Sequence, residues 1–170
     1  PTTTEMGLAL ECSLSAINSA EEKTNFSVIP SQHTIKLTVI CQHSQIISNL
    51  EADGFRSLQH LRHLVIQQCN FQSIPPRSFW GLTALESLSI KTPWISHSEG
   101  NKGKGDGKDR GSSDGFMRIH VDAFYGVNKL LTLDLSENQI QQFPVNTLCP
   151  LNNLKFLNVS KNNLKAKSIP

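Results

Sequence analysis

The sequence lacks the features of a membrane span, a signal peptide or a strongly charged binding surface. No apolar run approaches the roughly 18 residues needed to cross a bilayer. The start, PTTTEMGLALEC, has neither a basic beginning nor a continuous apolar segment. Charged residues make up 18% of the 170 residues, and the formal net charge is only +2. A charge this small gives no ground for nucleic acid or an anionic membrane as a partner.

Organised sets of catalytic or metal-binding residues are also missing. Six histidines are present, but the local pairs Cys41/His43 and His60/His63 have no second half at ligand spacing. The glycine-rich run at 100–115 precedes no helical pattern, so it does not predict a phosphate-binding loop. No serine, histidine and acid arrangement follows from the spacing. The sequence therefore predicts a protein that is not an enzyme and needs no metal or cofactor.

What the sequence does contain is a repeated leucine pattern, clearest in residues 130–151. Leu130, Leu133, Leu135, Asn138 and Ile140 form L-x-x-L-x-L-x-x-N-x-I, the core of a leucine-rich repeat. The alternating part favours a short strand with its leucines facing inward. The asparagine follows at the turn, where its amide can satisfy backbone groups. One such unit cannot bury its apolar face alone, so the pattern requires neighbouring units.

Three further units repeat the pattern, beginning at Leu61, Leu85 and Leu154. They hold a cysteine, a proline and an asparagine, respectively, at the asparagine position. The period is 24 residues, and the 45 residues between Leu85 and Leu130 equal one period plus an insertion of 21. Residues 96–115 contain Gly, Ser and charge without an apolar side chain, which predicts a disordered loop.

The repeats predict an α/β leucine-rich repeat solenoid, curved, with a parallel β-sheet on its concave face. Residues 1–34 contain no repeat and are predicted to form an N-terminal cap over the first strand. Residues 35–58 are predicted to be a first, irregular repeat. Residues 59–170 are the leucine-rich repeats, which we expect to continue beyond this sequence because it ends inside a unit.

The four cysteines leave two pairings open. A disulfide between Cys12 and Cys41 would close a loop of about 30 residues and stabilise the fold by a few kcal/mol. Alternatively, Cys12 pairs with a cysteine upstream of Pro1. Cys69, at an asparagine position, is predicted to be a buried free thiol, and Cys149 to lie near a convex loop.

Two N-glycosylation acceptors are present, Asn25-Phe26-Ser27 and Asn158-Val159-Ser160. They are used only if the chain passes through the secretory pathway. Asn158 is predicted to lie in the middle of a strand on the concave face. A glycan there would obstruct large ligands and move recognition to the flanks or to the Asn25 end.

Side chains between the inward leucines are predicted to form a ligand-binding face. Mixed polar side chains on a rigid sheet suit the recognition of a protein. Val65 and Phe156 are the apolar exceptions and are therefore the predicted hot spots. The candidate face comprises Arg62, His63, Val65, Gln67, Glu86, Ser89, Lys91, Asp134 and Phe156.

The segment TNFSVIP at residues 24–30, with its flank through Cys41, resembles the N-terminus of insect-type Toll receptors. The Tollo/18-wheeler group is the most similar subgroup. The resemblance covers most of the chain except residues 96–115. It continues through Leu50-Glu51-Ala52, Phe55, Cys69, Asp122-Ala123-Phe124 and Leu133-Asp134-Leu135-Ser136.

This resemblance implies the ligand-recognition part of a single-pass receptor on the extracellular side of the plasma membrane. The membrane span and the cytoplasmic signalling domain of the family are not in this sequence. The implied partner is a cystine-knot cytokine of the Spätzle kind or a receptor ectodomain, with dimerisation as one form, in immune or developmental signalling. The alternative is a leucine-rich adhesion or matrix protein without a signalling domain.

Overall fold

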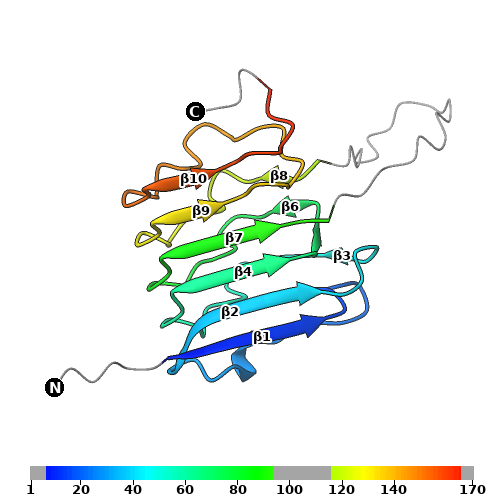
Figure 1. Ribbon diagram of the computed structural model, residues 1–170, viewed down its shortest axis with the longest axis vertical. Helices are drawn as coiled ribbons and strands as arrows, with labels where there is room; N and C mark the ends of the chain where they lie inside the picture. Colours follow the sequence, from blue (N-terminus) through cyan, green and yellow to red (C-terminus); the bar gives the residue numbers. More distant parts are fainter. Residues whose placement is uncertain (1–6, 94–115, 166–170) are drawn as a thin grey trace.

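The computed structural model describes residues 7–93 and 116–165, which form a stack of coils with one long parallel sheet along one side (Figure 1). Six strands make up this main sheet in the order β1-β2-β4-β7-β9-β10. Every neighbouring pair is parallel. The strands are β1 (Leu8–Leu14), β2 (Thr34–Cys41), β4 (His63–Gln67), β7 (Ser87–Lys91), β9 (Thr132–Asp134) and β10 (Phe156–Asn158). The leucine-rich repeat solenoid predicted from the sequence is confirmed.

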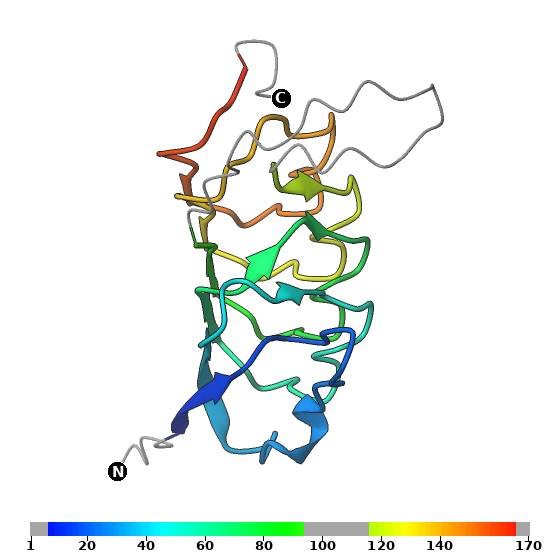
Figure 2. The same ribbon diagram turned by 90° about the vertical axis from the view of Figure 1, so that its right-hand side faces the viewer.

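Two small parallel sheets lie on a second side of the coils, away from the main sheet (Figure 2). They are formed by the segments that come after the main-sheet strands in the sequence. In one, β3 (Ile47–Ser48) pairs with β5 (Asn70–Phe71). In the other, β6 (Ser73–Ile74) pairs with β8 (Arg118–Ile119) and sets Ile74 beside Ile119. The repeat therefore resumes at Ile119 after the insertion, as the spacing predicted.

The core runs through the stack as columns of equivalent side chains. Leu37, Leu64, Leu88 and Leu133 are aligned in register on adjacent strands, and each is completely buried. Phenylalanines form a second column, in which successive rings stack with centroids 4.7, 6.2 and 6.0 Å apart. Stacked rings of this kind add to the burial of apolar area. This column consists of Phe26, Phe55, Phe79 and Phe124.

The helical part of the α/β prediction is wrong for the described residues. Their only helix is the 3₁₀ turn η1 (Phe26–Val28), and none is long and apolar enough to cross a membrane. Elsewhere the returning segments are turns and short strands. Pro75 and Pro76 show one reason, because proline has no N–H to donate and disfavours helix at the residue before it.

Residues 7–34 contribute a strand to the main sheet, which the repeat pattern did not predict. Strand β1 pairs with β2 along its length, with Leu10 opposite Leu37 and Cys12 opposite Val39. This segment is therefore a coil of the solenoid with its own strand in the main sheet. Its role as a cap stays a prediction.

The insertion predicted to be disordered, 96–115, lies outside the described residues. Strands β7 and β9 on either side of it are direct neighbours in the main sheet, with Leu88 opposite Leu133. Strands β7 and β9 therefore belong to consecutive coils of the solenoid.

Candidate ligand-binding face

Side chains that point away from the core form straight rows across the main sheet, because the strand register repeats from coil to coil. We call this surface the sheet face. One row runs Lys36, His63, Ser87, Thr132, Phe156. The next runs Thr38, Val65, Ser89, Asp134, Asn158. A third row contains Ile40, Gln67 and Lys91.

The structure places seven of the nine predicted ligand-face residues in these rows, and Arg62 and Glu86 lie just outside them. Most lie within β4, β7, β9 or β10. Arg62 and Glu86 directly precede β4 and β7, and the Arg62 carbonyl accepts hydrogen bonds from the Glu86 and Ser87 N–H groups, both at 2.9 Å. This bonding extends the strand alignment by one residue. Whether the surface binds a ligand stays a prediction.

The two predicted hot spots occupy different environments. Val65 is half-buried at the middle of the sheet, between Thr38 and Ser89. Phe156 is 69% exposed and lies on β10, the last strand of the sheet. A central apolar side chain surrounded by polar neighbours matches the arrangement of an interface hot spot better than one at an edge.

Sequence reasoning missed the part of the sheet face that lies on β1 and β2. Glu11 on β1 pairs with Thr38, and Lys36 and Ile40 lie in the rows on either side. Ile40 is half-buried and adds a second apolar side chain near Val65. The alternation of residues 35–41 was the available signal, but these residues were assigned only to an irregular repeat.

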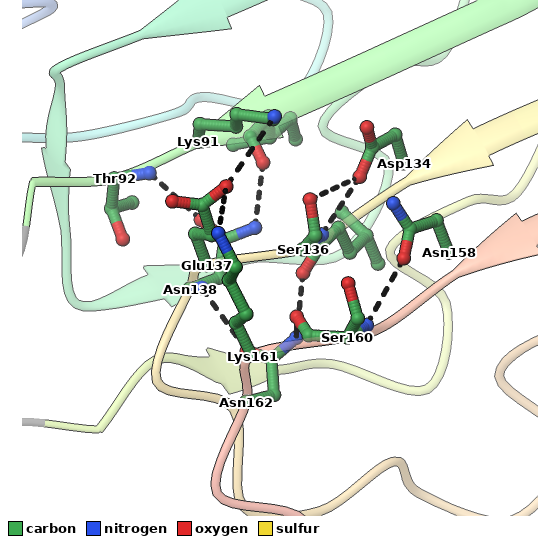
Figure 3. A network of polar contacts seen from close by, with 12 residues as sticks. Lys91, Thr92, Asp134, Ser136, Glu137, Asn138, Asn158, Ser160, Lys161 and Asn162 are labelled. Atoms are coloured by element: carbon green, nitrogen blue, oxygen red, sulfur yellow. Dashed lines mark hydrogen bonds and ion pairs between the residues drawn. The ribbon is translucent and has the colours of Figure 1, made fainter.

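Two asparagines, Asn138 and Asn162, tie turns at the end of the main sheet to the coil before them (Figure 3). Asn138, which is 1% exposed, donates from Nδ2 to the Ile90 carbonyl at 2.6 Å. Its Oδ1 accepts from the Thr92 N–H at 2.9 Å. The turn that has Pro93 at its own asparagine position is therefore held by the asparagine of the next coil.

Asn162 repeats this role one coil later. Its Oδ1 accepts from the N–H groups of Asn138 and Ile140, at 3.1 and 2.9 Å. Its Nδ2 donates to the Leu135 carbonyl at 2.7 Å. Buried backbone groups need such partners, so the two asparagines fix the edge of the sheet face through backbone atoms.

Cys69 makes the same link by a covalent bond. It forms a disulfide with Cys41 of the preceding coil, with Cα atoms 4.9 Å apart, a separation that suits a disulfide. The predicted Cys12–Cys41 pair and the predicted free thiol at Cys69 are therefore wrong. In the strand register Cys12 lies opposite Val39, whereas Leu14 lies opposite Cys41. Cys12 and Cys149 are free.

A group of three charges, also missed from the sequence, lies beside these asparagines (Figure 3). The Glu137 carboxylate is 3.6 Å from the Lys91 ammonium and 3.5 Å from that of Lys161. Glu137 and Lys161 both have left-handed backbones, with φ of 63° and 53°, one residue before each asparagine. Together, the two lysines and the glutamate place one net positive charge at the edge of the sheet face.

Asp134 is both a sheet-face residue and a structural one. Its Oδ1 accepts from the N–H and the hydroxyl of Ser136, at 2.9 and 2.6 Å. One coil later, Asn158 Oδ1 accepts from the Ser160 N–H at 3.1 Å. Asn158 is exposed and shares a row with Asp134 and Val65, so a glycan on it would stand on the sheet face.

Fold and sequence comparison define the class of this protein. The leucine rich repeat family matches residues 37–92 and 112–164, and the chain belongs to that family. Among individual proteins, it is similar to Toll-like receptor 7 of Drosophila melanogaster, with 27% identity over 151 residues. That match covers 88% of this chain and 10% of the relative, so the chain spans about a tenth of that receptor's length. The similarity supports the predicted relation to Toll-type receptors; the subgroup stays a prediction.

Proposed function

We propose that this chain is a ligand-recognition segment of a Toll-type cell-surface receptor and lies on the extracellular side of the plasma membrane. The observation that carries the proposal is the sheet face, with its aligned rows of mixed polar and apolar side chains. The similarity to Toll-like receptor 7 agrees with it. The role is recognition and not catalysis.

The centre of the proposed contact is the neighbourhood of Val65. His63 and Gln67 flank it on the same strand, and Thr38 and Ser89 flank it on the strands to either side. All five are half-buried. Strands paired on both sides hold these side chains in place before a ligand arrives, which lowers the ordering cost of binding.

The partner that fits this surface best is a protein. Acidic and basic side chains, such as Glu11, Lys36 and Asp134, are mixed along the rows, which favours a partner of mixed charge over a polyanion. By its relation to Toll-type receptors, we propose a cystine-knot cytokine of the Spätzle kind, or a second receptor ectodomain, as that partner.

The test is a binding measurement on secreted protein, with Val65→Glu and a matched Val145→Glu control. Val145 is 74% exposed in the returning turn between β9 and β10. Against a panel of Spätzle-like cytokines and Toll ectodomains, we expect Val65→Glu to weaken binding at least tenfold, because it puts an unpaired charge at the centre of the contact. Val145→Glu should have no effect.

Circular dichroism of both variants should show that they remain folded. Equal effects of the two substitutions would refute the assignment of the sheet face. Binding to an adhesion partner on other cells, with none to cytokines or Toll ectodomains, would favour the leucine-rich adhesion or matrix protein instead.

A further inference from the structure

An open groove of about 560 Å³, lined by both polar and apolar groups, lies between the first two coils. One wall is the turn that contains η1, and the other is the turn of residues 51–59. Beneath them, Phe26 and Phe55 stack with ring centroids 4.7 Å apart. The coiled ribbon of η1 lies across the coils from the main sheet in Figure 2, so this groove is separate from the sheet face.

Asn25 lines this groove and is the acceptor residue of the first glycosylation motif. Its Oδ1 accepts hydrogen bonds from the Ser27 N–H at 3.0 Å and from the Ser27 hydroxyl at 2.6 Å. Both bonds use the oxygen, so the side chain is held while Nδ2, the atom that carries a glycan, takes no part in them. Asn25 is exposed, which leaves room for a sugar at the rim.

The opposite wall presents groups that suit the hydroxyl and acetamido groups of sugars. Gln59 and Asp53 offer an amide and a carboxylate. Arg56 also lines the groove, and its guanidinium lies 5.2 Å from the centre of the Trp80 ring, a cation–π contact that holds it in place. Side chains fixed before binding lose less entropy when they form new hydrogen bonds.

We propose that this groove holds the first sugars of an N-glycan on Asn25, its two N-acetylglucosamine residues. Attachment breaks the C1–O bond of a lipid-linked pyrophosphate donor and forms a C1–N bond to Nδ2, which loses one proton as the lipid pyrophosphate leaves. The seated sugars then link the first coil to the second.

Asn158 provides the contrast. It lies on the open sheet face, at the last strand of the main sheet. A glycan there would extend into solvent. Removing the Asn158 acceptor therefore leaves a chain in which the effect of the Asn25 glycan can be measured alone.

The experiment uses the full 170-residue chain with Asn158→Gln, made with its glycan in a secretory host and without it in a bacterial host. Mass spectrometry reports occupancy of Asn25, and hydrogen exchange reports local stability. We expect the glycan to slow exchange of backbone amides in 24–29 and 51–59 at least threefold, and to leave those of 84–91 unchanged.

Two further variants decide whether the groove causes the effect. Gln59→Ala, in the groove, should remove at least half of the slowing, whereas Gln72→Ala, at an exposed position outside it, should keep all of it. An unoccupied Asn25, an occupied Asn25 without slower exchange, or equal effects of the two glutamine variants would each overturn the proposal. None of these results depends on ligand binding at the sheet face, so the two proposals fail separately.

Discussion

Replacing Asn138 by alanine should destabilise the protein by about 2–4 kcal/mol. The substitution removes two hydrogen bonds to the preceding coil, one to the Ile90 carbonyl and one from the Thr92 N–H. A buried backbone group that loses its partner costs about 1–3 kcal/mol. Ile90 is fully buried, whereas Thr92 is half-buried, so its N–H can partly recover a hydrogen-bond partner from water. The total destabilisation therefore stays below twice the largest cost of one lost partner.

Two other asparagines serve as comparisons within the same protein. Asn162 makes equivalent bonds but is half-buried, and we expect Asn162→Ala to cost only about 1–2 kcal/mol. Asn152 is exposed in a turn, and its replacement should change stability by less than about 0.5 kcal/mol. The expected order of destabilisation is therefore 138, then 162, then 152.

Urea unfolding followed by circular dichroism gives the free energies, and hydrogen exchange locates the change. Loss of the Asn138 side chain should speed exchange of the Thr92 amide specifically, because that N–H loses its acceptor. The reasoning would be refuted by an Asn138→Ala variant within about 0.5 kcal/mol of the parent, or by unchanged protection at Thr92.

Other substitutions test the core, a turn and the disulfide. Leu133→Ala removes a completely buried side chain and should cost about 2–5 kcal/mol in chemical unfolding; a near-neutral result would contradict the strand assignment. Gly81→Ala should cost about 1–3 kcal/mol, because φ is +95° and the new Cβ would lie 2.8 Å from a backbone atom of the preceding coil. Gly54→Ala, without that conformation, is its control. Replacing Cys41 and Cys69 together by alanine should lower the free energy of unfolding by about 3 kcal/mol, and thiol labelling of the denatured, unreduced parent should find two free thiols.

The repeat architecture could be predicted because its physical signal recurs. A buried leucine column needs an apolar residue at the same place in every coil, and Leu64, Leu88 and Leu133 supply it. The first coil was missed because Leu10 and Leu14 alternate but lack the rest of the repeat. They show that alternation alone predicts a strand without saying which sheet it joins.

The cysteine pairing could not be predicted because it depends on register between coils. The sequence pattern led to Cys12–Cys41, or Cys12 with an upstream cysteine, and Cys69 was predicted to be a free thiol. The strand register decides which pair forms. Cys41 lies opposite Leu14 of the first coil and not opposite Cys12, whereas Cys69 of the next coil is close enough to Cys41 to form the disulfide. The candidate site was predicted in part for a similar reason. Residues beside clear leucines were found, whereas Ile40, beside an irregular repeat, was not.

The interactions that hold the coils together place few constraints on the outward side chains of the sheet face. Strand pairing, inward leucines and the links from Cys69, Asn138 and Asn162 all act through the backbone or the core. Ion pairs at the surface, such as the one between Lys91 and Glu137, contribute only about 0–1 kcal/mol. Most outward side chains therefore add little to folding, apart from Asp134, whose carboxylate also bonds Ser136. Substitution at the other positions of the face can therefore change its surface chemistry at small cost in stability, which agrees with the proposed role in recognition.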